Sequence, residues 1–387
     1  MRVIFVHNGA DLYGASRSFL RLCSRMVRDG ITVRAVLPES GPLLDALRDA
    51  GVDVLVLHPL PLIERRAFRS LSGIIKTIWC TPVSVWRLRG VIRDFQPDLV
   101  HSNLSVLYTP AIAARWMRIP HVWHIRECYG EFGAFWKIYR RFMLWGSDRI
   151  LAVSQAVADQ FGAQGAGRVM VLHNGFPIEE FDAVPVARQR AFRDRVGVRD
   201  EPLVGLVGRI KFVRKGQEYL AEAAALLKDR FPDVRYVLVG SAFPGNEAHV
   251  DALRERIAAL GVGDRVLLAG DVEDIKAAYA AMDIVVMASG LPEPFGGVVI
   301  EAMAMGKPVV GSAMGGTLEQ VVDGVTGLLV PPRDPVALAK ALARLLENEE
   351  LRQRMGAAGR KHFEQHFAFG PFYDALRALY REVTCGC

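Results

Sequence analysis

Short runs of β-branched and aliphatic residues alternate with longer stretches of helical pattern along the first half of the chain. Seven such runs are RVIFVHN (2–8), TVRAVLP (32–38), VDVLVLH (52–58), DLVHSN (98–103), HVWHI (121–125), RILAVS (149–154) and RVMVLHN (168–174). Strands that alternate with helix-length segments are typical of βαβ units and a mostly parallel sheet. This half predicts a Rossmann-like domain.

The second half repeats the same pattern. Its strand-like runs are PLVGLVG (202–208), VRYVLVG (234–240), RVLLAG (265–270), DIVVMAS (283–289), KPVVGSA (307–313) and TGLLVP (326–331). Between the halves, NGFPIEEFDAVP (174–185) is rich in proline and acidic residues and is interpreted as a linker. After Pro332 three helical stretches follow, without another convincing strand. The sequence therefore predicts an α/β protein with two Rossmann-like domains.

Length and composition agree with two soluble domains. The chain has 387 residues, of which 51% are hydrophobic and 23% charged, so each half can bury a stable core. The apolar run at the N-terminus is too short for a signal peptide, and no run approaches the roughly 18 apolar residues of a spanning helix. We expect a cytoplasmic protein. Five cysteines without CxxC spacing indicate free thiols rather than disulfides or a zinc site.

In open α/β sheets, ligands bind beyond the carboxyl ends of the strands, so motifs are sought there. The first strand is followed by GADLYGAS (9–16), in which Gly9 and Gly14 have nearly the spacing of a P-loop. Ala15 stands where that motif needs a lysine, which excludes an ATPase loop. Either the glycines let the backbone approach a diphosphate or a sugar, or they only make a tight turn.

The first strand of the second half leads into GRIKFVRKG (208–216), a basic loop. Arg209 and Lys215 could neutralise a diphosphate leaving group there. Because Lys211 and Arg214 are also present, the loop taken alone is more typical of a solvated basic turn, and that interpretation is favoured.

The most informative segment is PEPFGGVVIE (292–301). Two prolines hold Glu293 in an extended loop, and a helix is predicted to begin near Gly296 and Gly297, with free amides that suit an anion. Apolar neighbours surround Glu301, so we expect it to be buried. A buried carboxylate needs a hydrogen-bonding duty, either internal or to a ligand, and the ligand role is favoured.

A glycosidase offers another interpretation of Glu293 and Glu301. Its two carboxyls flank the scissile bond at a defined separation that sequence cannot give. However, a hydrolase gains nothing from Arg209 and Lys215 directed at phosphate, so phosphate-linked sugar chemistry fits better.

One further candidate follows a strand of the first half. His124 in HVWHIRE (121–127) could make a polar contact at the ligand site, or it could be structural. No Asp-x-Asp motif occurs in the chain, so a divalent cation has no obvious ligands and we expect a metal-independent site without a cofactor.

Taken together, these segments resemble the retaining glycosyltransferases of family four, which have the GT-B fold. The resemblance spans nearly the whole chain: YGASRS (13–18), HIRE (124–127), VLHNGF (171–176), GRIKFVRKG (208–216), PEPFGGVVIE (292–301) with its E-x7-E motif, and GKPVVGSAMGGTLEQVVDGVTGLLVPP (306–332). The last two are the most specific. The first loop departs from the pattern because it lacks a double glycine and has Ala15-Ser16 in place of a small-acidic pair.

The resemblance implies two Rossmann-like domains facing across a cleft, followed by C-terminal helices. Residues 1–180 would form the acceptor-side domain, 181–370 the nucleotide-sugar-binding domain, and 371–387 a helix returning toward the first domain. It also implies roles for ten residues. Arg209 and Lys215 would lie at the donor diphosphate, Glu301 at the ribose, Glu293 and His124 at the donor sugar, Val272 at the base, the backbone of Phe295, Gly296 and Gly297 around sugar and phosphate, and Gly14 of the first loop at the donor.

The implied reaction moves a hexose-type unit from a UDP or GDP sugar to a glycan or lipid-linked glycan acceptor, with retention of anomeric configuration. The departing phosphate is thought to help deprotonate the acceptor, so no enzyme nucleophile is needed. A sugar-nucleotide epimerase of similar fold and a catalytically silent nucleotide-sugar-binding subunit are the alternatives.

Positive charge is concentrated in the first half, where residues 1–180 hold 22 Lys and Arg against 15 Asp and Glu. Between 65 and 93 there are seven cations, beginning with Arg65, Arg66 and Arg69, and no acid, and Ile and Trp residues lie among them. FWKIYRRFMLW (135–145) repeats the theme. Such helices either bind an anionic membrane surface at the inner leaflet, as in surface-polysaccharide assembly, or only pack on their sheet. No recognition motif supports nucleic-acid binding.

Overall fold

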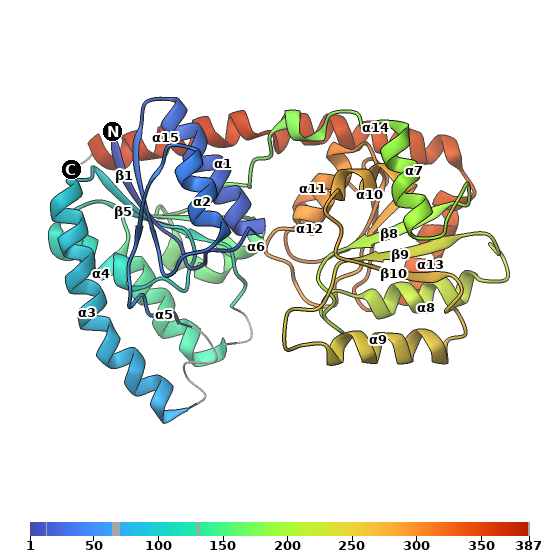
Figure 1. The fold of residues 1–387 in the computed structure, drawn as a ribbon, viewed down its shortest axis with the longest axis horizontal. Helices are drawn as coiled ribbons and strands as arrows, with labels where there is room; N and C mark the ends of the chain where they lie inside the picture. Colours follow the sequence, from blue (N-terminus) through green and yellow to red (C-terminus); the bar gives the residue numbers. More distant parts are fainter. Residues whose placement is uncertain (13, 64–69, 130–131, 386–387) are drawn as a thin grey trace. The chain divides into compact units, whose positions relative to one another are not determined.

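The computed structural model describes residues 1–12, 14–63, 70–129 and 132–385. The chain forms two compact units (Figure 1): unit 1 contains Met1–Gly175 and Gly370–Cys387, and unit 2 contains Phe176–Phe369. The predicted domain boundaries are 180 and 370. Each unit has a parallel sheet covered by helices, so the two predicted Rossmann-like domains of a GT-B fold are confirmed.

Unit 1 has a seven-stranded sheet in the order β3-β2-β1-β4-β5-β6-β7. Its strands are β1 (Arg2–Val6), β2 (Thr32–Leu37), β3 (Asp53–Val56), β4 (Leu99–Ser102), β5 (His121–Ile125), β6 (Arg149–Ala152) and β7 (Val169–Val171). Its helices are α1 (Gly14–Arg28), α2 (Pro42–Asp49), α3 (Leu71–Phe95), α4 (Thr109–Met117), α5 (Gly133–Gly146), α6 (Gln155–Ala158), η2 (Asp159–Gly165) and α15 (Phe369–Cys385). All seven predicted strands are present.

Unit 2 has a six-stranded sheet in the order β10-β9-β8-β11-β12-β13. Its strands are β8 (Leu203–Val207), β9 (Arg235–Val239), β10 (Val266–Gly270), β11 (Ile284–Met287), β12 (Val309–Ser312) and β13 (Gly327–Val330). Its helices are η3 (Ile178–Phe181), α7 (Val186–Arg195), α8 (Gln217–Leu227), α9 (Ala248–Ala259), α10 (Ile275–Ala281), α11 (Gly297–Ala304), α12 (Thr317–Gln320), α13 (Pro335–Leu346) and α14 (Glu349–His366). All six predicted strands and the three helices after Pro332 are confirmed.

Every strand pairing in the two sheets is parallel, for example Val3 with Val33 between β1 and β2, and Val204 with Tyr236 between β8 and β9. Parallel strands are covered on both faces, which explains why they read as continuous apolar runs rather than as alternating ones. The carboxyl ends of the strands meet along one edge of each sheet. That edge is where the candidate site residues lie.

The segment predicted to be a linker is partly built into unit 2. Phe176 and Phe181 are 8% and 7% exposed and belong to the apolar core of that unit. Phe176 N–H donates to Phe367 O, and Phe369 N–H donates to Phe176 O, each at 2.9 Å. The two passages of the chain between the units therefore lie side by side, and their aromatic rings anchor them.

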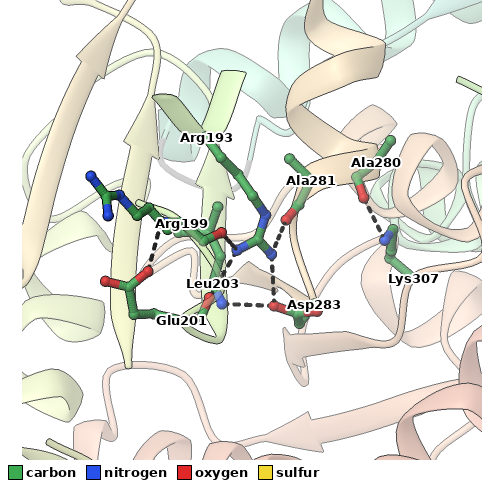
Figure 2. A network of polar contacts seen from close by, with 8 residues as sticks. All are labelled: Arg193, Arg199, Glu201, Leu203, Ala280, Ala281, Asp283 and Lys307. Atoms are coloured by element: carbon green, nitrogen blue, oxygen red, sulfur yellow. Dashed lines mark hydrogen bonds and ion pairs between the residues drawn. The ribbon is translucent and has the colours of Figure 1, made fainter. Parts of the chain in front are cut away.

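A polar network holds the amino-terminal ends of β8 and β11 together (Figure 2). The Arg193 guanidinium donates to Ala281 O at 2.7 Å and to Asp283 Oδ2 at 3.1 Å. The same carboxylate oxygen accepts the Leu203 N–H at 2.8 Å, and Lys307 Nζ donates to Ala280 O at 2.7 Å. Because these residues lie at the edge opposite the strand carboxyl ends, the network stabilises the sheet and leaves the candidate site to the other edge.

No helix in the described part of the chain combines the length and the apolarity that crossing a bilayer requires. Arg65, Arg66 and Arg69 lie outside the described residues.

Candidate functional site

The centre of the site in unit 2 is a close pair of opposite charges. Lys215 Nζ donates to Glu293 Oε1 at 2.8 Å, and Ser289 Oγ donates to the same oxygen at 3.2 Å. Glu293 is only 9% exposed. Lys215 comes from the loop after β8 and Ser289 from the end of β11, so two neighbouring strands position the carboxylate at their carboxyl ends.

A glycine brings the Lys215 loop this close to β11. Gly216 has a φ of 75°, and a Cβ there would lie 1.9 Å from Ala288 O. A side chain is excluded both by the left-handed backbone and by the contact. Gly216 therefore fixes the position of Lys215 beside the PEPF loop.

The other side of the PEPF loop is held by Gly315 and Gly316. Gly316 N–H donates to Glu293 O at 2.8 Å, and a Cβ on Gly315, whose φ is 55°, would lie 2.4 Å from that oxygen. This explains the double glycine in SAMGGTLE: it lets the loop after β12 support the backbone of Glu293 directly.

Helix α11 begins at Gly297, as predicted, and ends at Ala304. The prediction of free amides is wrong for Gly297, because its N–H donates to Phe295 O at 3.1 Å in a tight turn. A Cβ on Gly297 would meet only the Phe176 ring, at 3.9 Å, whereas one on Gly296 would meet Met287 Sδ at 2.7 Å. Gly297 thus leaves space at the helix start, and Gly296 is required by packing.

Glu301 corrects a second expectation, since it is half-buried rather than buried. Its Oε2 accepts a hydrogen bond of 2.8 Å from the Tyr279 hydroxyl of α10. Burial, and then the Glu301 charge, raises the pKa of Tyr279 well above its usual value. Tyr279 therefore stays a phenol that donates to the carboxylate and orients it. The apolar neighbours of Glu301 in sequence bury the remaining faces of α11.

Three more predicted residues lie at the same edge of unit 2. Arg209, in the loop after β8, has its guanidinium 4.8 Å from the centre of the Phe243 ring, and Gln217 Nε2 donates to its carbonyl at 2.9 Å. Val272 follows β10 and is half-buried. Phe295 packs edge to face on Phe367 at 6.1 Å.

In unit 1, His124 is completely buried at the end of β5. Arg126 donates to its Nδ1 at 3.4 Å, so the proton of the neutral ring lies on Nε2. Burial first, and then Arg126 and His101, lower the pKa of His124 well below its usual value. Nε2 has no hydrogen-bond partner among the described residues. A buried donor without a partner is costly in free energy.

A chain of hydrogen bonds links the ends of β1 and β4 to the loop after β1. Asn103 Nδ2 donates to His7 Nδ1 at 3.0 Å, His7 Nε2 donates to Ser16 Oγ at 3.1 Å, and Ser16 Oγ donates to Asp11 Oδ1 at 3.0 Å. Burial lowers the pKa of His7 to about 3, with Arg126 adding to the effect and Asp11 opposing it. Ser16, which departs from the family pattern, thus has a defined structural partner.

Glu127, three residues after His124, is a second polar residue here, and it is half-buried. Its Oε2 accepts from Ser105 Oγ and, at 3.0 Å, from Arg126 N–H. Burial raises the pKa of Glu127, which these hydrogen bonds partly offset. Sequence reasoning missed His7, Asn103 and Glu127 as partners of the site. His7 and Asn103 come directly after β1 and β4, and Glu127 is the second residue after β5, so their position at strand ends was the signal that could have found them.

Gly14 is the first residue of α1. A Cβ at this position would meet nothing within 4 Å, so the backbone there is open to approach. Among the described residues, no group of three His, Cys, Asp or Glu side chains could hold a metal ion. The structure brings Lys215 and Glu293 together. Arg209, Val272, Phe295, Gly296 and Gly297 lie in segments that follow strands of the same unit, and Glu301 lies in α11. In unit 1, His124 is near the end of β5 and Gly14 begins α1.

Two family models match the chain. Residues 13–180 match "Glycosyltransferase Family 4", and residues 188–362 match "Glycosyl transferases group 1". The matches fall on units 1 and 2 and together cover most of the chain.

Two curated relatives are also glycosyltransferases by name. The alpha-D-kanosaminyltransferase of Streptomyces kanamyceticus is 36% identical over 52% of this chain and 51% of its own length. The D-inositol 3-phosphate glycosyltransferase of Streptomyces coelicolor is 34% identical over 61% and 55%. The chain thus spans about half the length of these relatives.

A solved structure matches over the full length. Anabaena HepE in complex with UDP is 26% identical, with a TM-score of 0.85 over 99% of this chain and all of that one. HepE has also been solved with UDP-glucose, in a structure that is 25% identical with a TM-score of 0.83.

Proposed function

We propose a transfer reaction for this chain, which belongs to the GT-B glycosyltransferases of group 1. The chain moves a hexose-type sugar from a UDP or GDP sugar to a hydroxyl group of an acceptor. The acceptor is a glycan or a lipid-linked glycan in surface-polysaccharide or glycoconjugate assembly. The anomeric configuration of the sugar is retained.

The observation that carries this proposal is the Lys215–Glu293 pair at the carboxyl ends of β8 and β11. Glu293 takes one of the three N–H directions of the ammonium, and the Lys215 side chain is 32% exposed. The other directions can reach a phosphate oxygen. In this assignment Lys215 and Arg209 stabilise the charge of the departing nucleoside diphosphate, and Glu293 accepts from donor-sugar hydroxyls.

Glu301 and Tyr279 support the nucleotide part of the assignment. A ribose offers two neighbouring hydroxyl donors, and a carboxylate accepts both through its oxygens. The Tyr279 hydroxyl holds the Glu301 carboxylate in one orientation at 2.8 Å. The phosphates then lie near the start of α11, where Gly297 leaves space, and Val272 contacts the base.

HepE supports the donor class, because that relative was solved with both UDP and UDP-glucose. The two folds are similar over nearly the full length, with a TM-score of 0.85. We infer the same class of donor, a nucleoside diphosphate sugar, and leave the choice between UDP and GDP to measurement.

The buried histidine contributes a hydrogen bond rather than a proton. His124 is neutral with its proton on Nε2, so it donates to a hydroxyl of the donor sugar. The departing diphosphate accepts the proton of the attacking hydroxyl on the same face of the sugar. The C–O bond to phosphate breaks as the bond to the acceptor oxygen forms, and no covalent enzyme intermediate is needed.

Calorimetric titration tests the donor assignment. UDP and GDP are titrated into the wild-type chain and into Glu301→Gln, which keeps the shape of the side chain and removes its charge. One nucleotide should bind, and the variant should bind it at least about tenfold more weakly, the equivalent of 1.4 kcal/mol. Glu222→Gln, which changes a carboxylate paired with Arg256 on the outside of unit 2, serves as the matched control. Equal affinity of wild type and Glu301→Gln contradicts the assignment.

A further inference from the structure

Helix α3 carries apolar residues on two faces. Val85, Leu88, Ile92 and Phe95 are at most 5% exposed and belong to the core of unit 1. Figure 1 shows α3 as a long helix whose amino-terminal half extends away from the sheet. Packing on the domain core accounts for the apolar residues of one face of α3. It does not account for those of the second face.

The second face is exposed over three turns. Ile75, Ile78, Trp79 and Trp86 are 53%, 63%, 73% and 70% exposed. Ile78 and Trp79 lie three and four residues after Ile75, and Trp86 lies seven residues after Trp79, so the four side chains form one stripe of the helix. Large apolar side chains gathered on a surface mark an interaction site. Trp79 and Trp86 also exclude the simple expectation that this segment only packs on its sheet and exposes arginines.

A groove lies between this stripe and α4. It has a volume of about 680 Å³ and is lined by Ile78, Pro82, Trp86, Ile112 and Trp116, and Arg89 is the one charged lining residue among the residues that the structure describes. The Arg89 guanidinium stacks on the Trp116 ring at 3.8 Å. Its Nε is buried and has no hydrogen-bond partner in the described part of the chain. An apolar groove with one cationic donor at its side suits an anionic amphiphile.

A second hollow adjoins the first and shares Trp86 and Arg89 with it. It has a volume of about 610 Å³, and its lining includes Arg34, Arg87, Arg93, Asp53 and Asp94. Arg34 is paired with both acids, at 2.6 Å with Asp53 and 2.9 Å with Asp94. Arg34 and the two acids together leave one negative charge, so with Arg87, Arg89 and Arg93 the named lining residues carry a net charge of +2. Arg89 thus stands between an apolar space and a basic one.

We propose that the α3–α4 groove binds an anionic lipid of a bilayer, with a hydrocarbon chain along Trp86 and Trp116 and the phosphate of the headgroup on Arg89. Trp79 and the isoleucines beside it enter the headgroup region, where amphipathic tryptophan rings and arginines are favoured. The site lies outside the donor-binding residues, and this proposal does not rest on the proposed transfer reaction.

Other occupants fit the surface less well. A second copy of the chain would oppose this basic face to an identical one in a twofold interface, which places like charges together. A nucleic acid would match the arginines and leave the apolar groove without a hydrocarbon to fill it. The pairing of apolar volume and positive charge is complementary to a lipid with a phosphate headgroup.

Vesicle flotation tests the proposal with the full chain. Vesicles of phosphatidylcholine are compared with vesicles that also contain phosphatidylglycerol, for the wild type, Arg89→Glu and Trp79→Ser. The chain should float with the anionic vesicles only, and each variant should reduce the bound fraction at least about fivefold. Trp79→Ser changes a residue that is 73% exposed, so it keeps the test valid if Arg89→Glu unfolds. Arg254→Glu, on the outside of α9, is the matched control and should bind as the wild type does.

Two further measurements distinguish a lipid headgroup from free phosphate, and a lipid from a second copy of the chain. A short-chain phosphatidylglycerol below its micellar concentration should quench tryptophan emission, and inorganic phosphate at the same ionic strength should not displace it. Sedimentation velocity reports self-association. The proposal is overturned by equal binding to neutral vesicles, by binding that survives both variants, by displacement with inorganic phosphate, or by a dimer that Trp79→Ser dissociates.

Discussion

Lys215 and Glu293 are 78 residues apart in sequence, and their side chains form an ion pair of 2.8 Å at the carboxyl ends of β8 and β11. The pair joins the basic loop and the E-x7-E segment, two motifs that the sequence could only treat separately. Gly216 and Gly316 make the approach possible from either side. In the proposed assignment, the Lys215 ammonium of this pair also faces the departing diphosphate.

Breaking this pair should affect both stability and turnover. Lys215→Ala leaves the nearly buried Glu293 carboxylate with Ser289 as its remaining side-chain donor among the described residues. We expect this to lower the stability of unit 2 by about 1–2 kcal/mol. The same change should reduce the rate of nucleotide release at least about tenfold, because it removes a stabilising charge from the leaving group. Thermal unfolding and nucleotide release measure the two effects. Arg254→Ala removes an exposed pair with Asp251 and should change neither, and an unchanged rate in Lys215→Ala would refute the leaving-group role.

The hydroxyl of Tyr279 should matter for donor binding through Glu301. Tyr279→Phe keeps the buried ring and removes the hydrogen bond to the carboxylate, so stability should fall by about 1–2 kcal/mol and nucleotide affinity should weaken several-fold. Tyr236→Phe is the matched control, because the Tyr236 hydroxyl is buried without a hydrogen-bond partner in the described residues. The control should be neutral or stabilising. Equal behaviour of the two variants contradicts the orienting role of Tyr279.

Gly216 should not tolerate a side chain. The positive φ alone costs about 1–3 kcal/mol for a residue with a Cβ, and the contact of 1.9 Å with Ala288 O adds to that. Gly216→Ala should destabilise unit 2 and weaken nucleotide binding, because the Lys215 loop must move. Gly263→Ala, at a position where a Cβ meets nothing within 4 Å, provides the control for calorimetry and thermal unfolding. Normal affinity in Gly216→Ala would show that the loop position is unimportant.

Unit 1 should lose stability as the pH falls. Burial lowers the pKa of His7 to about 3 and that of His121 to about 4, against the effects of Asp11 and Asp148, and it lowers the pKa of His101 and His124 as well. Between pH 6.5 and about 4 the unfolded chain binds protons that the folded chain does not. Each buried ring therefore lowers the free energy of unfolding of unit 1 by about 1.4 kcal/mol for every unit that the pH falls in that window.

Tryptophan emission measures this effect in unit 1 alone, because all six tryptophans lie between Trp79 and Trp145. Denaturant titrations at a series of pH values give the slope. The slope of unfolding free energy against pH reports the number of protons bound on unfolding. His121→Gln should reduce that number by about one, and His249→Gln, in unit 2, should leave it unchanged. A stability of unit 1 that is flat between pH 6.5 and 4.5 is incompatible with neutral buried histidines.

The strands were the most predictable part of the fold. Parallel strands are covered on both faces, so runs such as RILAVS and DIVVMAS are apolar throughout and stand out from the helical pattern between them. The start of α11 was also predictable, because Pro294 and the glycines after it are local signals of a helix beginning.

The partners of the site side chains were not predictable. Glu301 is half-buried because its side chain lies toward Tyr279 of another helix, and periodicity in an eight-residue helix cannot show that direction. Asn103 meets His7 across 96 residues of sequence, and Lys215 meets Glu293 across 78. Such contacts follow from strand order, which the sequence alone does not give.

The central claim is tested most directly by following a nucleotide sugar in the presence of the chain. Proton NMR of a panel of UDP and GDP α-hexoses distinguishes the outcomes by the anomeric signals. The account predicts release of the nucleoside diphosphate from one donor, with the sugar appearing first as the α-anomer, and loss of that release in Glu293→Gln. A new nucleotide sugar, an initial β-anomer, or no binding and no release with any donor would contradict it.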